Sequence, residues 1–220
     1  MSTLQQLKAD FLLSLRETAS DTHFTDSQQT GFLNMGMRFV AVLSNSNTDM
    51  INMVSEENVG AYNYPKDGLL IADAYFGNEL VAGDTYPLQV MTKKFMKETI
   101  PGWLDETSGA AGKPKYLIKI DRNTVYIHPR PDSSNAGKKI FLDYGYVPSP
   151  MIADGDEPDL PLVFHDIIVL YALSRAYDSL SNVEMAAKKF NDFKSQYVLL
   201  KDVVDREAED TFRWKWMVPE

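Results

Sequence analysis

The sequence predicts an α+β protein in which N- and C-terminal helices form one helical bundle around a central antiparallel β domain, followed by an extended C-terminal tail. Apolar residues recur at helical spacing in the first 45 residues and again after residue 160. The middle third instead holds short aromatic and β-branched runs separated by glycine and proline. We therefore divide the chain into N-terminal helices (1–45), a β-rich domain (46–150), C-terminal helices (151–207) and a tail (208–220).

Two helices are expected before residue 45. The first spans Thr3 to Thr18, where leucine and phenylalanine recur every three or four residues. The second follows Thr25, which can cap it because Gln28 stands three residues further on and completes a capping box. This helix is expected to end near Ser44, where the turn-forming stretch SNSNTD follows.

The middle third is expected to fold as strands, with one short helix at 92–99. The clearest unit is KYLIKI and TVYIHP joined by DRN, which predicts a β-hairpin with a tight turn. The runs NVGAYNYP, GLLIADAYFG, TYPLQV and KKIFLDYGYV are also predicted as strands.

An acidic, proline-marked linker, PSPMIADGDEPDLP, leads to two long helices, at 161–179 and from Asn182 to about Glu207. Pro161 suits the first turn of a helix, where its missing N–H costs nothing. The first of these helices is apolar on nearly every face. Its longest apolar run, Ile167 to Leu173, is too short to span a bilayer, which needs about 20 residues. We therefore expect no membrane contact.

The composition narrows the classes of function. The 220 residues carry a formal net charge of −9 and contain no cysteine. The acidic balance argues against a dedicated nucleic-acid binder, which needs clustered Lys and Arg, and the absence of cysteine excludes a disulfide framework. The charged N-terminus lacks the apolar core of a signal peptide, so we expect a soluble protein made in a cytoplasm.

No catalytic or cofactor-binding motif is recognised. The sequence has no phosphate-binding loop, no dinucleotide fingerprint, no HExxH and no GxSxG. His165 and Asp166 could be a base with an orienting acid, but adjacent side chains of a helix point in different directions. A structural role is therefore expected for His165, and no catalytic residue and no cofactor are predicted.

The linker acids Asp154, Asp156 and Glu157 resemble the start of a calcium loop. Gly155 is misplaced for an EF-hand, so a solvated linker is favoured and no metal site is predicted. A cell-wall hydrolase carried by a particle stays open as an alternative. It would need two acids across a cleft, with Asp166, Glu157 and Asp156 as the acids to test.

The last residues, DTFRWKWMVPE, differ from the charged helix before them. Aromatic residues, Met and Arg are enriched at the buried centres of protein interfaces. The tail can fold back onto its own core or anchor into a partner, and the partner is favoured. The residues concerned are Phe212, Arg213, Trp214, Trp216 and Met217.

Four segments in order resemble the head-to-tail adaptors of tailed bacteriophages, also called head-completion or tail tubular protein A-like proteins. These segments are FTDSQQTGFLNMGMRFVAVL, YNYPKDGLLIADAYFGN, GKPKYLIKIDRNTVYIHPRPDSSNAGKKIFLDYGYVPSP and LPLVFHDIIVLYALSRAYDSLSNVEMAAKKFNDFKSQYVLL. The resemblance covers most of 24–204 and includes Asn34, where the family often has a Leu-Asn pair. It departs from the family at Ser46 to Asn58, where relatives often carry a tryptophan that is missing here.

The resemblance implies a structural virion protein of the neck region. Such adaptors form a homo-oligomeric ring, typically a dodecamer, beneath the portal protein, and they present a platform to a tail, nozzle or tail-tube protein. The portal contact would fall to the five tail residues named above. An acidic channel wall would repel phosphate, so DNA would pass through without specific binding.

A ring would also explain the apolar helix at 162–180, because one face could pack inside the subunit and another against a neighbour. Arg175 and Asp178 lie at the rim of this helix and are the expected subunit-interface residues. An adaptor of a baseplate or capsid surface stays open as a further alternative.

Overall fold

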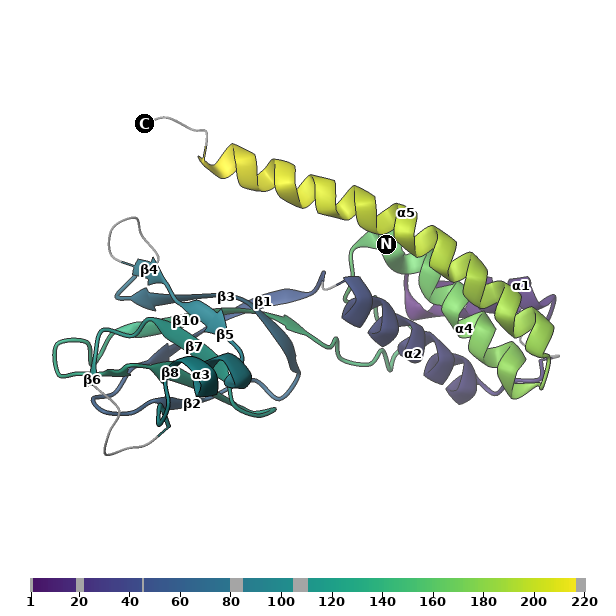
Figure 1. Cartoon of the computed structure of the whole chain (residues 1–220). Coiled ribbons are helices and arrows are strands. Elements are labelled where there is room, and N and C mark those ends of the chain that lie inside the picture. The colour runs from purple at the N-terminus through teal and green to yellow at the C-terminus, as the bar shows by residue number, and fades with distance from the viewer. Residues whose placement is uncertain (1, 19–21, 45, 80–84, 105–110, 217–220) are drawn as a thin grey trace. The chain divides into compact units, whose positions relative to one another are not determined.

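The computed structural model describes residues 2–18, 22–44, 46–79, 85–104 and 111–216, with side chains described up to residue 202. The chain forms two compact units (Figure 1). A helical unit combines Met1–Asn47 with Pro148–Glu220, and a β unit comprises Thr48–Val147. The β unit is thus inserted between the two halves of the helical unit, and the predicted α+β class is confirmed.

The helical unit is built from segments at both ends of the chain. Its elements are α1 (Leu4–Leu15), α2 (Asp26–Ser44), the short 3-10 helix η1 (Leu162–Phe164), α4 (His165–Ser179) and α5 (Val183–Trp216). Pro161 precedes η1 as its N-cap, so the proline starts a 3-10 turn instead of standing in the first turn of α4.

Hydrogen bonds from the flanking residues cap the first two helices. The Thr25 N–H donates to Gln28 Oε1 at 2.9 Å, and the Gln28 N–H donates to Thr25 Oγ1 at 3.3 Å, which confirms the predicted capping box. Thr3 and Gln6 form a second box, at 3.0 and 3.4 Å, that was not predicted. Both helices therefore start at residues that satisfy their otherwise free N–H groups.

Helix α4 lies at the centre of the helical unit and packs against α1, α2 and α5 (Figure 1). Most of its apolar side chains are buried within this chain, whereas Leu170, Tyr171 and Tyr177 are partly exposed. The expected contact of this helix with a neighbouring copy stays a prediction. The buried core includes Leu4, Leu7, Phe11, Leu33, Met37, Val40, Phe164, Ile167, Ile168, Ala172, Leu173, Ala176 and Phe193.

Helices α2 and α4 are in close contact at Gly36. A Cβ atom at this position would lie 2.7 Å from the backbone oxygen of Ile168. A Cβ atom built at Gly31, five residues earlier on α2, would instead lie in open space, with no such contact within 4 Å. The spacing between α2 and α4 therefore depends on the missing side chain at Gly36.

The linker after the β unit is hydrogen-bonded to α1 and α2. Asn34 Nδ2 donates to the Met151 oxygen at 2.9 Å, and the Met151 N–H donates to Asn34 Oδ1 at 2.8 Å. The N–H groups of Leu4 and Gln5 donate to the backbone oxygens of Asp156 and Asp154, at 2.7 and 3.0 Å. The linker backbone thus accepts hydrogen bonds from the first N–H groups of α1. These bonds and those with Asn34 hold the linker against both helices.

Helix α5 is much longer than the helix it packs on. Its 34 residues span about 51 Å at 1.5 Å per residue, whereas the 15 residues of α4 span about 22 Å. More than half of α5 therefore extends beyond the length of α4. The helix continues to Trp216, past the predicted end near Glu207, because no glycine or proline interrupts the sequence before Pro219.

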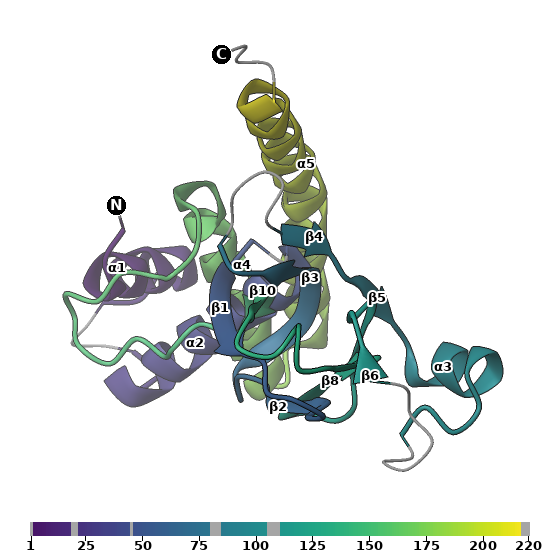
Figure 2. The same ribbon diagram turned by 90° about the vertical axis from the view of Figure 1, so that its left-hand side faces the viewer.

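The β unit consists of short strands and one short helix. They are β1 (Thr48–Val54), β2 (Ala61–Asn63), β3 (Gly68–Gly77), β4 (Thr85–Pro87), β5 (Gln89–Met91), α3 (Lys93–Thr99), β6 (Ala111–Gly112), β7 (Tyr116–Lys119), β8 (Thr124–His128), β9 (Arg130–Pro131) and β10 (Lys139–Tyr146). They form sheets of order β1-β10-β3-β4 and β2-β8-β7-β5, with a small β6-β9 pair. Figure 2 shows β1, β10 and β3 side by side.

The two larger sheets share one core. Phe76 and Leu142 from one sheet pack in the same cluster as Leu117 and Ile127 from the other, which is the arrangement of a β-sandwich. Helix α3 and the turn after it contribute to a second cluster, which contains Met96, Trp103, Ile118 and Tyr126.

Most strand predictions are confirmed, with two differences. Strands β7 and β8 pair antiparallel from Tyr116↔His128 to Lys119↔Val125, as the predicted hairpin requires. Strand β1 was not predicted, and only its first two residues, Thr48 and Asp49, were assigned, to the turn-forming stretch. Strand β5 pairs parallel to β7, and β6 pairs parallel to β9, so the largely antiparallel domain contains two parallel pairs.

Within the described residues, no helix combines the length and the apolar character that a membrane crossing requires.

Candidate interaction surface on the helical unit

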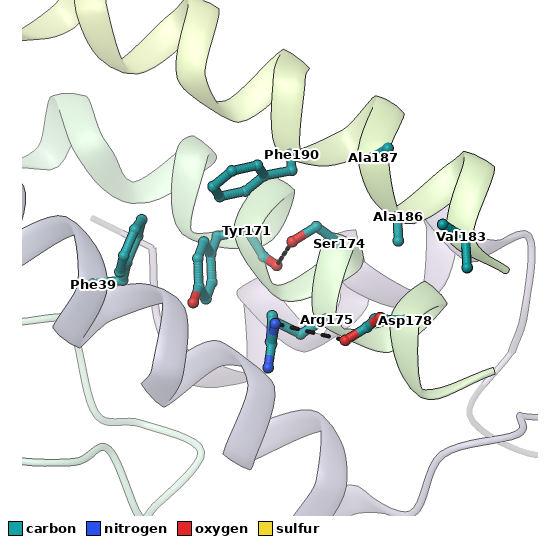
Figure 3. Close-up of a pocket in the computed structure, with 9 residues that line it drawn as sticks. All are labelled: Phe39, Tyr171, Ser174, Arg175, Asp178, Val183, Ala186, Ala187 and Phe190. Atoms are coloured by element: carbon teal, nitrogen blue, oxygen red, sulfur yellow. Dashed lines mark hydrogen bonds and ion pairs between the residues drawn. The ribbon is translucent and has the colours of Figure 1, made fainter. Parts of the chain in front are cut away.

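The predicted interface residues Arg175 and Asp178 stand at the edge of a groove between α2, α4 and α5 (Figure 3). The Arg175 guanidinium lies 3.6 Å from the Asp178 carboxylate, and both side chains are about half exposed. An exposed pair of this length contributes little to stability. Both charges therefore remain available to a partner.

Aromatic side chains line one end of this groove and small ones the other. The Phe39 ring stacks on Tyr171 with centroids 4.5 Å apart, and Phe190 lies 6.3 Å from Tyr171. Ala186 and Ala187 of α5 line the rest, and the hollow measures about 360 Å³. The Ser174 hydroxyl donates to the Tyr171 backbone oxygen at 2.7 Å. An apolar floor with a charged edge is the composition of a protein contact.

His165 and Asp166, the pair weighed as a base with an orienting acid, do not come together. His165 is buried and its Nε2 donates to the Leu160 oxygen at 3.1 Å, whereas Asp166 is exposed. The structure thus separates these two side chains, as helical geometry predicted. Burial and the nearby Arg130 lower the pKa of His128, whose ring stacks on Tyr116 in the β unit.

Two of the linker acids, Asp154 and Asp156, bind protein groups. Lys8, itself nearly buried, pairs with Asp26 at 2.7 Å and with Asp154 at 2.8 Å. Burial lowers the pKa of Lys8, but the hydrogen bonds to these two carboxylates outweigh it and raise the pKa above its usual value. Asp156 accepts the N–H groups of Ile152 and Ala153, and these bonds lower its pKa. Among the residues that the structure describes, no group of three or more His, Asp or Glu side chains could hold a metal ion.

The structure describes the five residues predicted to contact a portal only in part. The backbone of residues 212–216 belongs to α5, but their side chains lie outside the described part of the chain. Met217 lies outside the described residues altogether.

Sequence reasoning missed what the linker residues do. Asn34 was noted as part of a family pattern, but its bonds to Met151 join positions 117 residues apart. The exposed apolar side chain of Ile152 was not singled out either, because a linker position carries no periodicity. The sequence does not show which of the adjacent residues Met151 and Ile152 is buried.

Comparison with known proteins connects this architecture to one family. No curated protein matches the chain. The family model of the SU10 adaptor protein matches residues 2–215, which include both halves of the helical unit and the whole β unit. This match agrees with the predicted resemblance to bacteriophage head-to-tail adaptors. The chain therefore belongs to the SU10 adaptor protein family.

Proposed function

We propose that this adaptor assembles as a dodecameric ring in the neck of a tailed bacteriophage. The ring binds the portal protein on one side and a tail, nozzle or tail-tube protein on the other, and it continues the DNA channel. The family match over 2–215 is the observation that carries this proposal. The net charge of −9 supports it, because an acidic wall repels the phosphates of passing DNA.

In this proposal the C-terminal end of α5 contacts the portal. More than half of this helix extends beyond the length of α4, so its end is not needed to cover the bundle core. The side chains assigned to the contact have the composition of interface centres, with two tryptophans, a phenylalanine, an arginine and a methionine. They are Phe212, Arg213, Trp214, Trp216 and Met217.

The portal protein of the same phage provides the test. The purified adaptor is mixed with portal rings, and the complex is followed by sedimentation and imaged by electron microscopy. We expect an added ring on the portal, and the joint Trp214→Ala and Trp216→Ala variant should lose it. The Trp214→Phe and Trp216→Phe variant, which keeps aromatic anchors, should retain most binding. An adaptor that stays monomeric with its portal at high concentration would contradict the proposal.

A wall hydrolase is a weaker second candidate. A general acid in such an enzyme needs a raised pKa, whereas hydrogen bonds from Ile152 and Ala153 lower the pKa of Asp156. Wall clearing by the parent protein that is lost on Asp166→Asn or Glu157→Gln would favour this candidate.

A further inference from the structure

Ile152 is the most exposed large apolar side chain in the part of the chain that the structure describes. It is 81% exposed, and it lies in the linker that passes α1 and α2 (Figure 2). Single exposed apolar side chains are common on protein surfaces, so the exposure of Ile152 alone does not indicate a contact. What distinguishes Ile152 is the fixed backbone that carries it.

The backbone around Ile152 is fixed on both sides. Before it, the buried Met151 exchanges two hydrogen bonds with Asn34, at 2.8 and 2.9 Å. After it, the Asp156 carboxylate accepts the Ile152 and Ala153 N–H groups at 2.7 and 2.8 Å. A turn that is already fixed loses little conformational entropy when it binds. Ile152 therefore projects from a preformed turn, and we call its exposed side chain the knob.

The groove between α2, α4 and α5 offers a matching hollow. Its aromatic and alanine side chains provide an apolar floor, and about 360 Å³ exceeds the volume of an isoleucine side chain (Figure 3). Val183 at its end is 72% exposed, which leaves further apolar surface for a partner to cover.

The knob and the groove face different directions. Asn34, which holds the knob, and Phe39, which lines the groove, are five residues apart on α2. At 100° per residue they point about 140° apart around the helix axis. One copy therefore cannot place its own Ile152 in its own groove, and the two features are complementary only between different copies.

The charges near the two features are also complementary. Glu157 is the residue after Asp156, whose carboxylate accepts the N–H groups of the turn. Its own side chain is exposed and makes no ion pair with the described residues. Arg175 on the groove edge carries five donors and makes only the 3.6 Å contact with Asp178. A carboxylate entering with the knob can give Arg175 a closer, charge-assisted hydrogen bond.

We infer that Ile152 of one copy inserts into the α2–α4–α5 groove of the next copy, with Glu157 placed near Arg175. This contact joins two different surfaces, so repeated copies add head to tail and close into a ring when the rotation permits. The inference rests on the proposed ring and names the contact that holds it together.

Disulfide trapping tests this contact, because the chain has no cysteine of its own. An Ile152→Cys protein is mixed with an Ala187→Cys protein and oxidised mildly, alone and on portal rings. We expect covalent pairs several-fold more abundant than from either protein by itself, since the contact joins unlike surfaces. An Ile152→Cys and Ser195→Cys mixture is the control, because Ser195 lies on α5 about 12 Å beyond Ala187 and outside the groove.

Rings that assemble on the portal without trapping above the control would overturn this contact and leave the proposed function intact. Trapping of Ile152→Cys on a portal cysteine would also overturn it. Failure of any ring to form would remove the proposed function and this inference together. An Arg175→Glu variant should reduce trapping, and the Arg175→Glu and Glu157→Arg pair should restore it.

Discussion

Replacing Gly36 with alanine should destabilise the helical unit, although alanine is the better helix former. The new Cβ would lie 2.7 Å from the Ile168 oxygen, so α2 and α4 must move apart by at least 0.3 Å to reach even 3.0 Å. The contact is with backbone, which cannot rotate away. Overpacking of this kind costs about 1–3 kcal/mol. The gain in helix propensity offsets about 1 kcal/mol of that cost.

Gly31→Ala is the matched control. Gly31 lies in the same helix with open space around its Cβ position, so this variant has the same propensity gain without the clash. The difference between the two variants therefore isolates the packing cost, about 1–3 kcal/mol. At roughly 4 °C per kcal/mol, their melting temperatures should differ by about 4–12 °C when helix content is followed by circular dichroism. A Gly36→Ala protein as stable as Gly31→Ala would refute the close approach of α2 and α4.

Two further substitutions test other contacts. Asn34→Ala leaves the Met151 N–H and C=O without their partners, so it should cost about 1–3 kcal/mol and speed hydrogen exchange in the linker. Burial, then Asp73 and Asp49, raise the pKa of Asp143, so the folded state disfavours its carboxylate and loses stability as pH rises through that pKa. Asp143→Asn should therefore stabilise the protein at neutral pH, and denaturant titrations should show this gain shrinking as the pH falls below that pKa.

The parts of the fold that depend on local signals could be predicted from the sequence. The Thr25 and Gln28 side chains bond within one helical turn, so their spacing alone predicts the start of α2. The β7–β8 hairpin is similarly local, because a short turn joins adjacent strands.

The parts that depend on distant partners could not be predicted. Strand β1 is held by β10, about 90 residues away, and apolar and polar residues do not alternate strictly in its sequence, TDMINMV. The apolar surface of α4 indicated burial but not the covering elements, which come from both ends of the chain. Arg175 and Asp178 were identified from their place at the helix rim, but the groove beside them needs Phe39 of α2 and Phe190 of α5.

The insertion of the β unit also sets an order of events during synthesis. Residues 48–147 can complete their contacts while the second half of the helical unit is still unmade. Helices α1 and α2 can pack on each other through Phe11 and Phe32, but α4, the central element of their shared core, is made later. In the folded β unit, its first and last residues lie close together, because β1 pairs with β10. Folding of this unit therefore lowers the entropic cost of bringing together the two halves of the helical unit, which about 100 residues separate in the sequence. In a released, truncated chain that ends before residue 160, the β unit should therefore resist protease while the first two helices remain cleavable.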